Sequence, residues 1–487
     1  MKAVVLTFDR LPTHLLGCYG NEWIETPGFD RLASLGSVFD QHFAEVPGPV
    51  SSSHPWWTGR FEFFRDSVAD EQGDGCSVQS WLQRLNDQGV KCRLLAENTE
   101  GLPTELFCSI EAVGGVTGLN AAHDDVPIAR LVQRGIEILE GDGSAAAGTS
   151  ENSPAELLWL HSQGVPSPWL PPRLFAELYL DELEEIVDGE SGGEIASDLV
   201  GQFENDPDLV RLLLSDWRRE VEVEGEHGAD GGEESDEAAI TEVSGASNNE
   251  PDDIDSPEIE RQISRLVFAG YVSMIDRWLL KLLDAVENSG EKILLVVSAN
   301  QGHSFGETID LVPGAVGAAV SRYENAARTS DEVPAGWLSD TDVRTPLLIT
   351  EFCQAADNRE FGSRHAALVQ PVDVAATLED WFGGSKGSGR DAESVGESLL
   401  SALAGNTPEG RSEVFYLGSD GQMGIRSRHW GLVTSAEALH DEELVHSDVR
   451  LFAKPDDQWD VHDVSSQYSE VVDTLLGLLR RRCRVGK

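Results

Sequence analysis

The chain has 487 residues, of which 86 are Asp or Glu and only 36 are Lys or Arg, so its formal net charge is −50. A hydrophobic content of 40% is that of a globular protein with a large core. The excess of negative charge excludes broad binding to nucleic acids or to anionic membranes, because both are held by basic side chains.

The cysteines and the apolar segments predict the cellular compartment. Six cysteines are scattered along the chain without a CxxC pair, a pattern typical of reduced thiols in a cytosolic protein. No basic stretch followed by an apolar run opens the chain, and no apolar run approaches the roughly 20 residues of a membrane helix. We therefore expect a cytoplasmic protein. The cysteines are Cys18, Cys76, Cys92, Cys108, Cys353 and Cys483.

Short apolar strands alternate with amphipathic helices along most of the chain. Residues 3–8 form a nearly continuous apolar run that ends at Asp9, as in a buried parallel strand. The same patterns predict further strands over 91–96, 157–161, 293–298 and 347–349, and helices over 26–35, 78–88, 263–285 and 372–382. Such alternation predicts a mostly parallel α/β sheet covered by helices on both faces, with ligands at the carboxyl ends of its strands.

Two regions depart from this pattern. From about residue 413 the predicted strands become shorter and a helix over 468–480 closes the chain, so we expect domains over 1–405 and 406–487. Residues 220–258 are dominated by Glu, Asp, Gly, Ser and Asn, which predicts a disordered acidic insert. This insert is either a solvated loop or a docking segment for a basic partner.

Several motifs occur in an order typical of one enzyme family. The first are LTFDRL at 6–11, LGCYG at 16–20 and TPGFDRLA at 26–33. The later ones are TGR at 58–60, Tyr271 with IDR at 275–277, SANQG at 298–302 with GE at 306–307, VRTPL at 343–347, VDVAATL at 372–378, GIR at 424–426 and PDD at 455–457. Together they resemble the sulfatases of the alkaline-phosphatase superfamily. The resemblance implies a three-layer α/β sandwich with a small C-terminal α+β subdomain, and hydrolysis of sulfuric esters.

The resemblance implies a calcium site whose residues have changed. Sulfatases hold calcium with two aspartates after the first strand and an Asp-Asn or Asp-His pair at a later turn. The matching positions here are Asp9, Arg10, Asn300 and Gln301. Calcium requires six to eight oxygen ligands and, in practice, several negative charges. We therefore predict that calcium is absent and that Arg10 takes the place of the cation and pairs with Asp9.

The implied catalytic residues have changed as well. The sulfatase nucleophile, a Cys or Ser oxidised to formylglycine, begins a C-x-P-x-R motif nine residues before the Thr-Gly pair. That position is Pro49, and the motif's Arg falls on Ser53. A Lys and a His that hold the sulfate in the family align with Glu97 and Thr99, and another His aligns with Pro166.

Other residues could supply replacement chemistry. Ser51, Ser52 and Ser53 followed by His54 could provide a nucleophile and its base, or could cap a helix that begins near residue 55. His161 and His303 either face the pocket or are satisfied core histidines. His365 is a weak candidate for the site because it aligns only loosely with a loop region of the family. Trp56 and Trp57 pack in the core or stack on carbohydrate.

The sequence leaves three functional hypotheses open. The first is a pseudo-sulfatase that keeps the fold, lacks metal-dependent hydrolysis, and acts by binding a small molecule or a protein. The second is a divergent hydrolase of sulfate or phosphate esters that uses Asp9, Asn300 and a serine of the 51–53 run. The third is an acidic scaffold whose partner binds the 220–258 insert.

Overall fold

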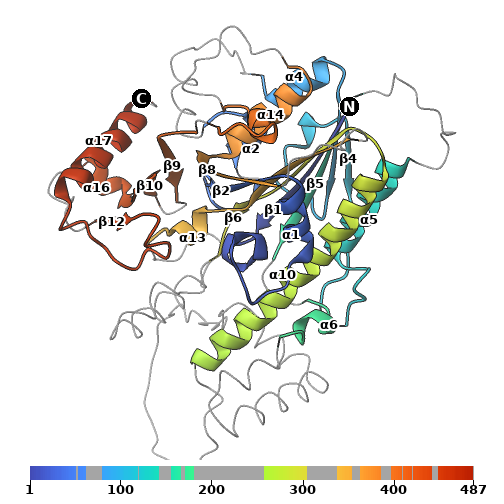
Figure 1. Cartoon of the computed structure of the whole chain (residues 1–487), viewed down its shortest axis with the longest axis horizontal. Coiled ribbons are helices and arrows are strands. Elements are labelled where there is room, and N and C mark those ends of the chain that lie inside the picture. Colours follow the sequence, from blue (N-terminus) through green and yellow to red (C-terminus); the bar gives the residue numbers. More distant parts are fainter. Residues whose placement is uncertain are drawn as a thin grey trace, which may run out of the picture.

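The computed structural model describes most of the chain outside the acidic region (Figure 1). The described residues are 1–50, 53–61, 79–118, 120–141, 155–165, 171–179, 257–303, 337–353, 362–384, 396–408, 410–418, 421–440 and 448–485. Residues 220–256 of the predicted insert lie outside these ranges, and its last two residues belong to the first described helix after it.

An eight-stranded sheet forms the centre of the main domain, in the order β4-β3-β5-β1-β6-β7-β2-β8. Its strands are β1 (Lys2–Arg10), β2 (Ser37–His42), β3 (Lys91–Ala96), β4 (Ser109–Ala112), β5 (Glu156–Gly164), β6 (Ile293–Gln301), β7 (Leu347–Phe352) and β8 (Ser363–Val369). Strand β7 runs antiparallel to its neighbours β6 and β2, while the other pairings in this sheet are parallel. The predicted mostly parallel sheet is therefore confirmed.

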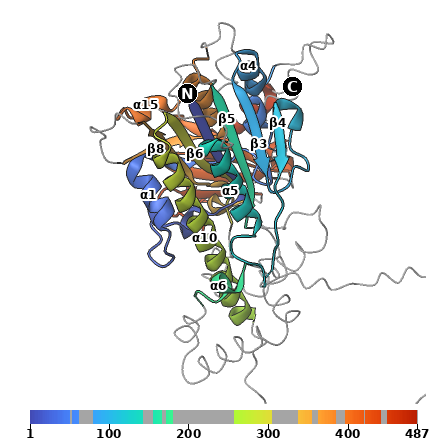
Figure 2. The same ribbon diagram turned by 90° about the vertical axis from the view of Figure 1, so that its right-hand side faces the viewer.

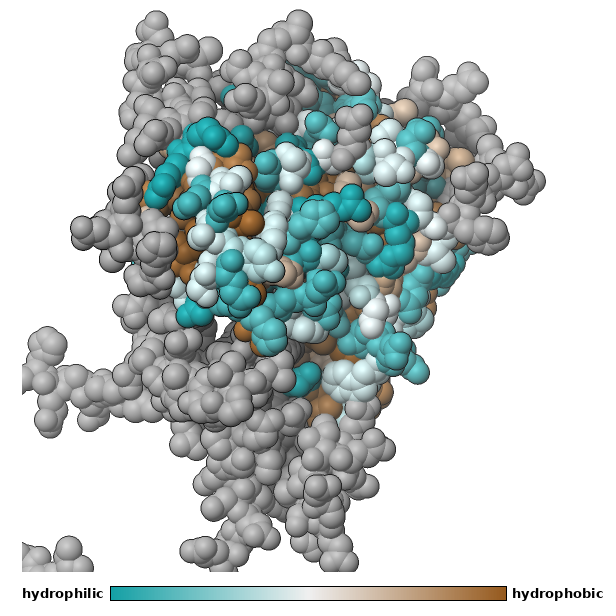
Figure 3. All heavy atoms as spheres, turned by 60° about the vertical axis from the view of Figure 1, so that its left-hand side comes forward, coloured by the Kyte–Doolittle hydropathy of each residue, from teal (hydrophilic) through white to brown (hydrophobic). Residues whose placement is uncertain are grey.

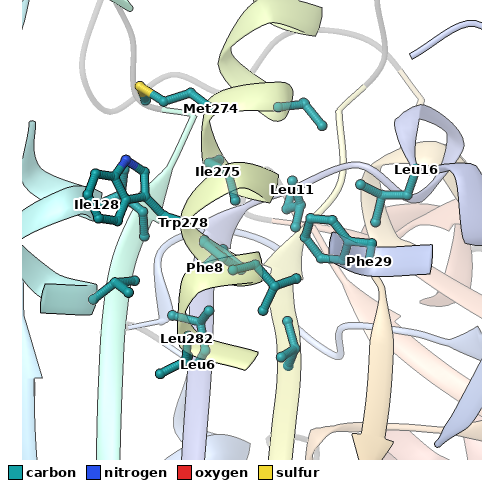
Figure 4. Packing of buried hydrophobic residues seen from close by; sticks show 14 of the residues in the cluster. Leu6, Phe8, Leu11, Leu16, Phe29, Ile128, Met274, Ile275, Trp278 and Leu282 are labelled. Carbon is teal, nitrogen blue, oxygen red and sulfur yellow. The ribbon is translucent and has the colours of Figure 1, made fainter. Parts of the chain in front are cut away.

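Helices cover both faces of this sheet (Figures 1 and 2). One face carries α1 (Pro27–Leu35), α5 (Pro127–Glu140) and α10 (Pro257–Asn288), and the other carries α2 (His54–Thr58), α4 (Trp81–Asp87) and α14 (Pro371–Trp381). The alternation of strand β1 supplies both cores: Leu6 and Phe8 face α10, whereas Ala3 and Val5 face the opposite layer. Figure 4 shows Trp278 and Leu282 of α10 beside Phe8 and Leu6 in this core.

The predicted elements recur with small shifts at their ends. Strand β3 spans the predicted residues 91–96, while α10 begins at residue 257, before the predicted start at 263. Pro27 occupies the first turn of α1, and Thr26 is its N-cap residue, as predicted. The Thr26 hydroxyl, however, does not cap this helix; it accepts a hydrogen bond from the backbone N–H of Gly17 at 2.8 Å.

A residue distant in sequence caps helix α1 instead. The buried Asp276 of α10 accepts hydrogen bonds from the backbone N–H groups of Gly28 (2.9 Å) and Phe29 (2.8 Å). A negative carboxylate at a helix N-terminus also interacts favourably with the helix dipole. The helices approach closely here, because a Cβ atom added to Gly28 would lie 2.7 Å from the carbonyl oxygen of Asp276. Burial raises the pKa of Asp276 to about 6.

A second, four-stranded antiparallel sheet forms the C-terminal subdomain, in the order β12-β11-β10-β9. Its elements are β9 (Glu413–Leu417), β10 (Gln422–Ser427), β11 (Trp430–Ser435), α16 (Ala436–His440), β12 (Val449–Ala453) and α17 (Ser469–Val485). Leu475, Leu476 and Leu479 of α17 pack on this sheet. The predicted change to shorter strands near residue 413 therefore corresponds to the first strand of a separate sheet. The domain boundary at residue 405 stays a prediction.

Short helical segments complete the described chain. They are η1 (Thr13–Leu15), η2 (Gly17–Tyr19), η5 (Thr104–Leu106), α6 (Arg173–Ala176), α13 (Asp340–Val343) and α15 (Leu400–Leu403). Hydrophilic residues cover most of the coloured face in Figure 3, with apolar residues in smaller areas between them. Within the described ranges, no helix combines the length and apolarity needed to cross a bilayer.

Buried charges join helix α13 to the C-terminal subdomain at a cluster that we call the charged junction (Asp340, Arg426, Lys454 and Asp460). The ammonium group of Lys454 lies 2.9 Å from Asp340 and 2.6 Å from Asp460, and Arg426 lies 3.3 Å from Asp340. Burial disfavours ionisation of Asp340, but Lys454 and Arg426 outweigh it and lower the pKa of this carboxyl. Burial and the neighbouring Asp340 raise the pKa of Asp460 to about 7.

Candidate functional site

The carboxyl ends of strands β1, β5 and β6 lie side by side and form the candidate site. Strand β1 pairs in parallel with both of the others, and Thr7 lies opposite His161 on one side and Ser298 on the other. This register places Asp9, His161 and Asn300 at one edge of the sheet, where open α/β sheets bind ligands.

Asp9 is held by two groups. Its Oδ1 accepts a hydrogen bond from the backbone N–H of Val50 at 2.6 Å and lies 3.3 Å from Nε2 of His161. The other ring nitrogen of His161 lies 3.1 Å from the Thr7 hydroxyl. His161 is buried, with both ring nitrogens close to a polar partner. These partners agree with a satisfied buried histidine, while its contact with Asp9 keeps His161 beside the candidate site.

Arg10 lies on the other face of strand β1 from Asp9. Successive side chains of a strand point to opposite faces, so Arg10 shares the face of Phe8 and helix α10. On that side the ring of His303 stacks on Phe268 with centroids 5.2 Å apart, and burial followed by Arg10 lowers the pKa of His303 well below its usual value. Asp9 is held by Val50 and His161, and its expected pairing with Arg10 stays a prediction.

Both the oxygen and the nitrogen of the Asn300 side-chain amide form hydrogen bonds with other groups of the protein. Its Oδ1 accepts a hydrogen bond from the indole N–H of Trp56 at 2.9 Å, and its Nδ2 donates to the carbonyl oxygens of Val46 and Gly48, each at 2.9 Å. Asn300 is fully buried. It therefore serves as a tie between strand β6, helix α2 and the segment that precedes this helix.

That segment, residues 46–50, contains the position of the expected nucleophile. Asn300 holds it at Val46 and Gly48, Asp9 holds it at the Val50 N–H, and the indole of Trp57 donates to the Val50 carbonyl oxygen at 2.9 Å. Pro49 lies between these anchors. The side chains of Asp9 and Asn300 thus hold this loop in position.

Helix α2 begins at His54, close to the predicted residue 55. Ser53 is its N-cap residue but makes no capping hydrogen bond, so the predicted capping role is absent for this side chain. Ser53 is fully buried, and its hydroxyl has no hydrogen-bond partner among the residues that the structure describes. The candidates Ser51 and Ser52 lie outside the described residues.

Glu97 follows strand β3 and contacts the end of strand β5. Its two carboxylate oxygens accept hydrogen bonds from the Ser162 hydroxyl (2.7 Å) and the Gln163 backbone N–H (3.0 Å). Burial outweighs these hydrogen bonds and raises the pKa of Glu97 to about 7. Glu97 can therefore exchange a proton near neutral pH. Thr99 lies in the loop that follows, where its carbonyl oxygen accepts from the Leu102 N–H at 3.2 Å.

The remaining candidates have structural surroundings. The backbone carbonyl of Gln301 accepts from the Leu11 N–H at 3.0 Å. His365 lies on the edge strand β8, where its Nε2 is 2.9 Å from the Ser363 hydroxyl. Trp56 and Trp57 are buried against Trp159, which supports core packing over carbohydrate stacking. Pro166 lies outside the described residues.

The side chains at the calcium position do not fit that ion. Asp9 already accepts a backbone N–H, Asn300 is bonded at both ends of its amide, and Arg10 is a cation. Within the described ranges, no three His, Cys, Asp or Glu side chains come together as a metal-binding group. A cavity of about 330 Å³ lies elsewhere, beside Glu379 and Asp380 of α14.

Several contacts of the site are not evident in the sequence. The hydrogen bond from Trp56 to Asn300 and the anchors of the 46–50 segment join residues that are far apart in the chain and follow no periodic pattern. The position of Asp9 and Arg10 at the end of strand β1, by contrast, could be predicted from the apolar run that precedes them.

Solved structures resemble this chain along nearly its whole length. One is a protein solved with its substrate D-glucosamine-2-N,6-O-disulfate, at 18% identity and a TM-score of 0.62, covering 99% of this chain and 97% of that one. A 2-O GAG sulfatase matches at 13% identity and a TM-score of 0.58, covering 100% of this chain and 92% of that one. The chain has the sulfatase fold. A phosphonate monoester hydrolase of Agrobacterium radiobacter shares this fold at 14% identity and a TM-score of 0.57, covering 100% of this chain and 96% of that one.

Sequence similarity to curated sulfatases is confined to short segments. Human arylsulfatase D is 40% identical over 60 residues, which are 12% of this chain and 10% of that protein. Human steryl-sulfatase is 35% identical over 89 residues, which are 18% of this chain and 12% of that protein. The match thus spans about a tenth of the length of these relatives. No protein-family model matches the chain.

Proposed function

We propose that this chain is a pseudo-sulfatase, a protein that uses the sulfatase fold to bind a ligand without metal-dependent ester hydrolysis. One observation carries the proposal: Asn300 and Asp9, at two of the family's metal positions, bind the protein's own 46–50 segment. An ion that displaced this hydrogen bond from the Asn300 oxygen would leave the buried indole N–H of Trp56 without an acceptor. A buried donor without an acceptor costs about 1–3 kcal/mol.

The charges around the site support the same proposal. Sulfate and phosphate esters are anions, and the position that holds a Lys in the family carries Glu97 here. Asp9 adds a second carboxylate at the same edge of the sheet. Asp9 and, in its ionised form, Glu97 repel an anionic ester when no cation is bound. The ligand that we propose is therefore a neutral small molecule or a protein segment, not an ionised sulfate ester.

A divergent ester hydrolase is the second candidate, and one set of contacts favours it. His161 lies 3.3 Å from Asp9, and Glu97, with a pKa of about 7, hydrogen-bonds to the strand that carries His161. A carboxyl that titrates near neutral pH is suited to general acid–base catalysis. The solved neighbours include sulfatases and phosphonate monoester hydrolases, so the substrate of such an enzyme would be a sulfate, phosphate or phosphonate ester.

One experiment on the purified full chain separates the two candidates. The melting temperature is measured with and without millimolar Ca²⁺, and hydrolysis of 4-nitrophenyl sulfate, 4-nitrophenyl phosphate and a 4-nitrophenyl phosphonate is followed in parallel. Because a ligand that binds the folded state raises the melting temperature, the pseudo-sulfatase proposal predicts no site-specific shift and no turnover.

The variant Asp9→Asn is the control for calcium that binds elsewhere on this acidic surface. An equal calcium shift in the wild type and the variant is nonspecific and agrees with the proposal. A calcium shift that the variant loses, or turnover that a chelator abolishes, would contradict it. Turnover without metal that is lost in His161→Ala would establish the second candidate.

A further inference from the structure

Two cysteines lie side by side at the edge of the main sheet. Cys92 is in strand β3, and Cys108 immediately precedes β4, which is one of the two edge strands and pairs with β3. Arg93 lies opposite Ser109 in this pairing, so Cys92 and Cys108 are neighbours just before it. The backbone N–H of Cys108 donates to the carbonyl oxygen of Cys92 at 2.9 Å, and the thiol of Cys108 lies 3.0 Å from the same oxygen.

The two thiols differ in exposure. Cys92 is completely buried beneath helix α4, and burial, with a smaller effect of Cys108, raises the pKa of its thiol to about 12. Cys108 is exposed to solvent. An oxidant therefore meets Cys108 first, and Cys92 can react only with a sulfur that is already beside it.

We propose that Cys92 and Cys108 are an oxidative modification site that forms a reversible disulfide between strands β3 and β4. In the first step the thiolate of Cys108 attacks a small-molecule disulfide, forms a mixed disulfide and releases one thiolate. In the second step the sulfur of Cys92 attacks the Cys108 sulfur of the mixed disulfide, and its proton passes to the departing small-molecule sulfur, which leaves as a thiol. Two protein thiols are oxidised, and one small disulfide is reduced to two thiols.

The geometry permits this bond and makes it easy to reverse. Neighbouring strands lie about 4.8 Å apart, within the roughly 4.4–6.8 Å between Cα atoms that a disulfide requires. Side chains at matching positions of parallel strands point to the same face, so both sulfurs lie on one side of the sheet. Because Cys108 is exposed to solvent, a small thiol can reach the bond and reduce it again.

The proposal does not rest on the proposed function, but the bond would affect the candidate site. It would close residues 93–107 into a covalent loop, and this loop carries Glu97 and Thr99. We therefore expect slower amide hydrogen exchange over residues 97–107 in the oxidised protein than in the reduced protein.

The test uses the full-length protein and 2-hydroxyethyl disulfide, a neutral oxidant that the acidic surface does not repel. After free thiols are blocked with iodoacetamide under denaturing conditions, peptides are mapped by mass spectrometry. The expected result is a Cys92–Cys108 peptide and the loss of two of the six titratable thiols, both reversed by dithiothreitol. Cationic cystamine should react faster than anionic glutathione disulfide because of the negative surface.

Two variants make the result decisive. Cys108→Ser should abolish the cross-link and the slower hydrogen exchange, whereas Cys353→Ser should leave both unchanged. A mixed disulfide that persists on Cys108 while Cys92 stays open to alkylation in denaturant would overturn the proposal. So would a cross-link from Cys108 to any other cysteine.

Discussion

The candidate site and the charged junction use buried polar residues in opposite ways. At the site, Asp9 and Asn300 bind backbone groups of one loop and the indole of Trp56. At the junction, Lys454 and Asp340 bind each other and hold two parts of the fold together. At the site the side chains form hydrogen bonds with uncharged N–H and C=O groups, whereas at the junction oppositely charged side chains neutralise each other. A polar residue at a family position therefore indicates a function only once its partners are known.

The largest expected effect is at the junction. Lys454→Met leaves Asp340 and Asp460 buried without their shared ammonium group. Breaking a buried ion pair by removing one partner costs about 3–5 kcal/mol, and we expect a loss of this size in the free energy of unfolding measured with urea. The exposed Lys91→Met in strand β3 is the matched control and should change little. A loss below about 1 kcal/mol for Lys454→Met would mean that the junction is not neutralised as described.

Asn300→Asp tests the site with a smaller change. An aspartate keeps the acceptor for Trp56 but loses the two N–H donors to Val46 and Gly48, and it places a negative charge against their carbonyl oxygens. We expect a loss of about 2–3 kcal/mol, the cost of buried acceptors left unpaired. Added calcium should not restore this stability in a urea titration. Restoration to the wild-type value would show that the site still accommodates an ion.

The pH dependence of stability compares the two regions through one titrating carboxyl in each. The pKa values of Asp460 and Glu97 are both raised to about 7, whereas unfolded carboxyls titrate near 4. The folded state therefore binds extra protons, and the stability this provides is complete below about pH 4 and is lost as the pH rises through 7. The urea midpoint should fall between pH 5 and pH 8.

Two substitutions divide this pH dependence between the regions. Asp460→Asn should remove the contribution of the junction, and Glu97→Gln, which keeps an acceptor for Ser162, should remove that of the site. Each variant should therefore show a flatter profile of urea midpoint against pH. A wild-type profile without any slope in this range would contradict both assignments.

The smallest effect is expected for Ser53→Ala. An N-cap serine is ordinarily worth about 1 kcal/mol, but the Ser53 hydroxyl caps nothing and has no hydrogen-bond partner in the described part of the chain. Its removal should change the melting temperature little, by the equivalent of less than about 1 kcal/mol. If the protein hydrolyses an ester, this variant should keep the full rate. A lost rate with unchanged stability would return Ser53 to the catalytic candidates.

The sequence predicts the sheet well because its signals are local. The apolar run before Asp9 and the strand over 91–96 correspond to β1 and β3. The rule that ligands lie at the carboxyl ends of strands places Asp9 and Asn300 at one edge, where the structure has them.

Partnerships across the fold lie beyond such local signals. The position of Asn300 could be predicted, but its bonds to Val46 and Gly48 depend on a loop whose path is set by tertiary contacts. The junction has no periodic pattern either, because Lys454 and Asp460 both follow strand β12 in an irregular segment. Such pairs are identified only when the two sheets are placed together.

The carboxylate of Asp276 has a consequence for the order in which the chain acquires its structure. It supplies the cap of helix α1 from a position 248 residues beyond Gly28. During synthesis at the ribosome, a nascent chain that has not yet reached this aspartate therefore lacks the group that fixes the beginning of α1. A fragment that ends before α10 should likewise show less helix over residues 27–35 than the complete chain.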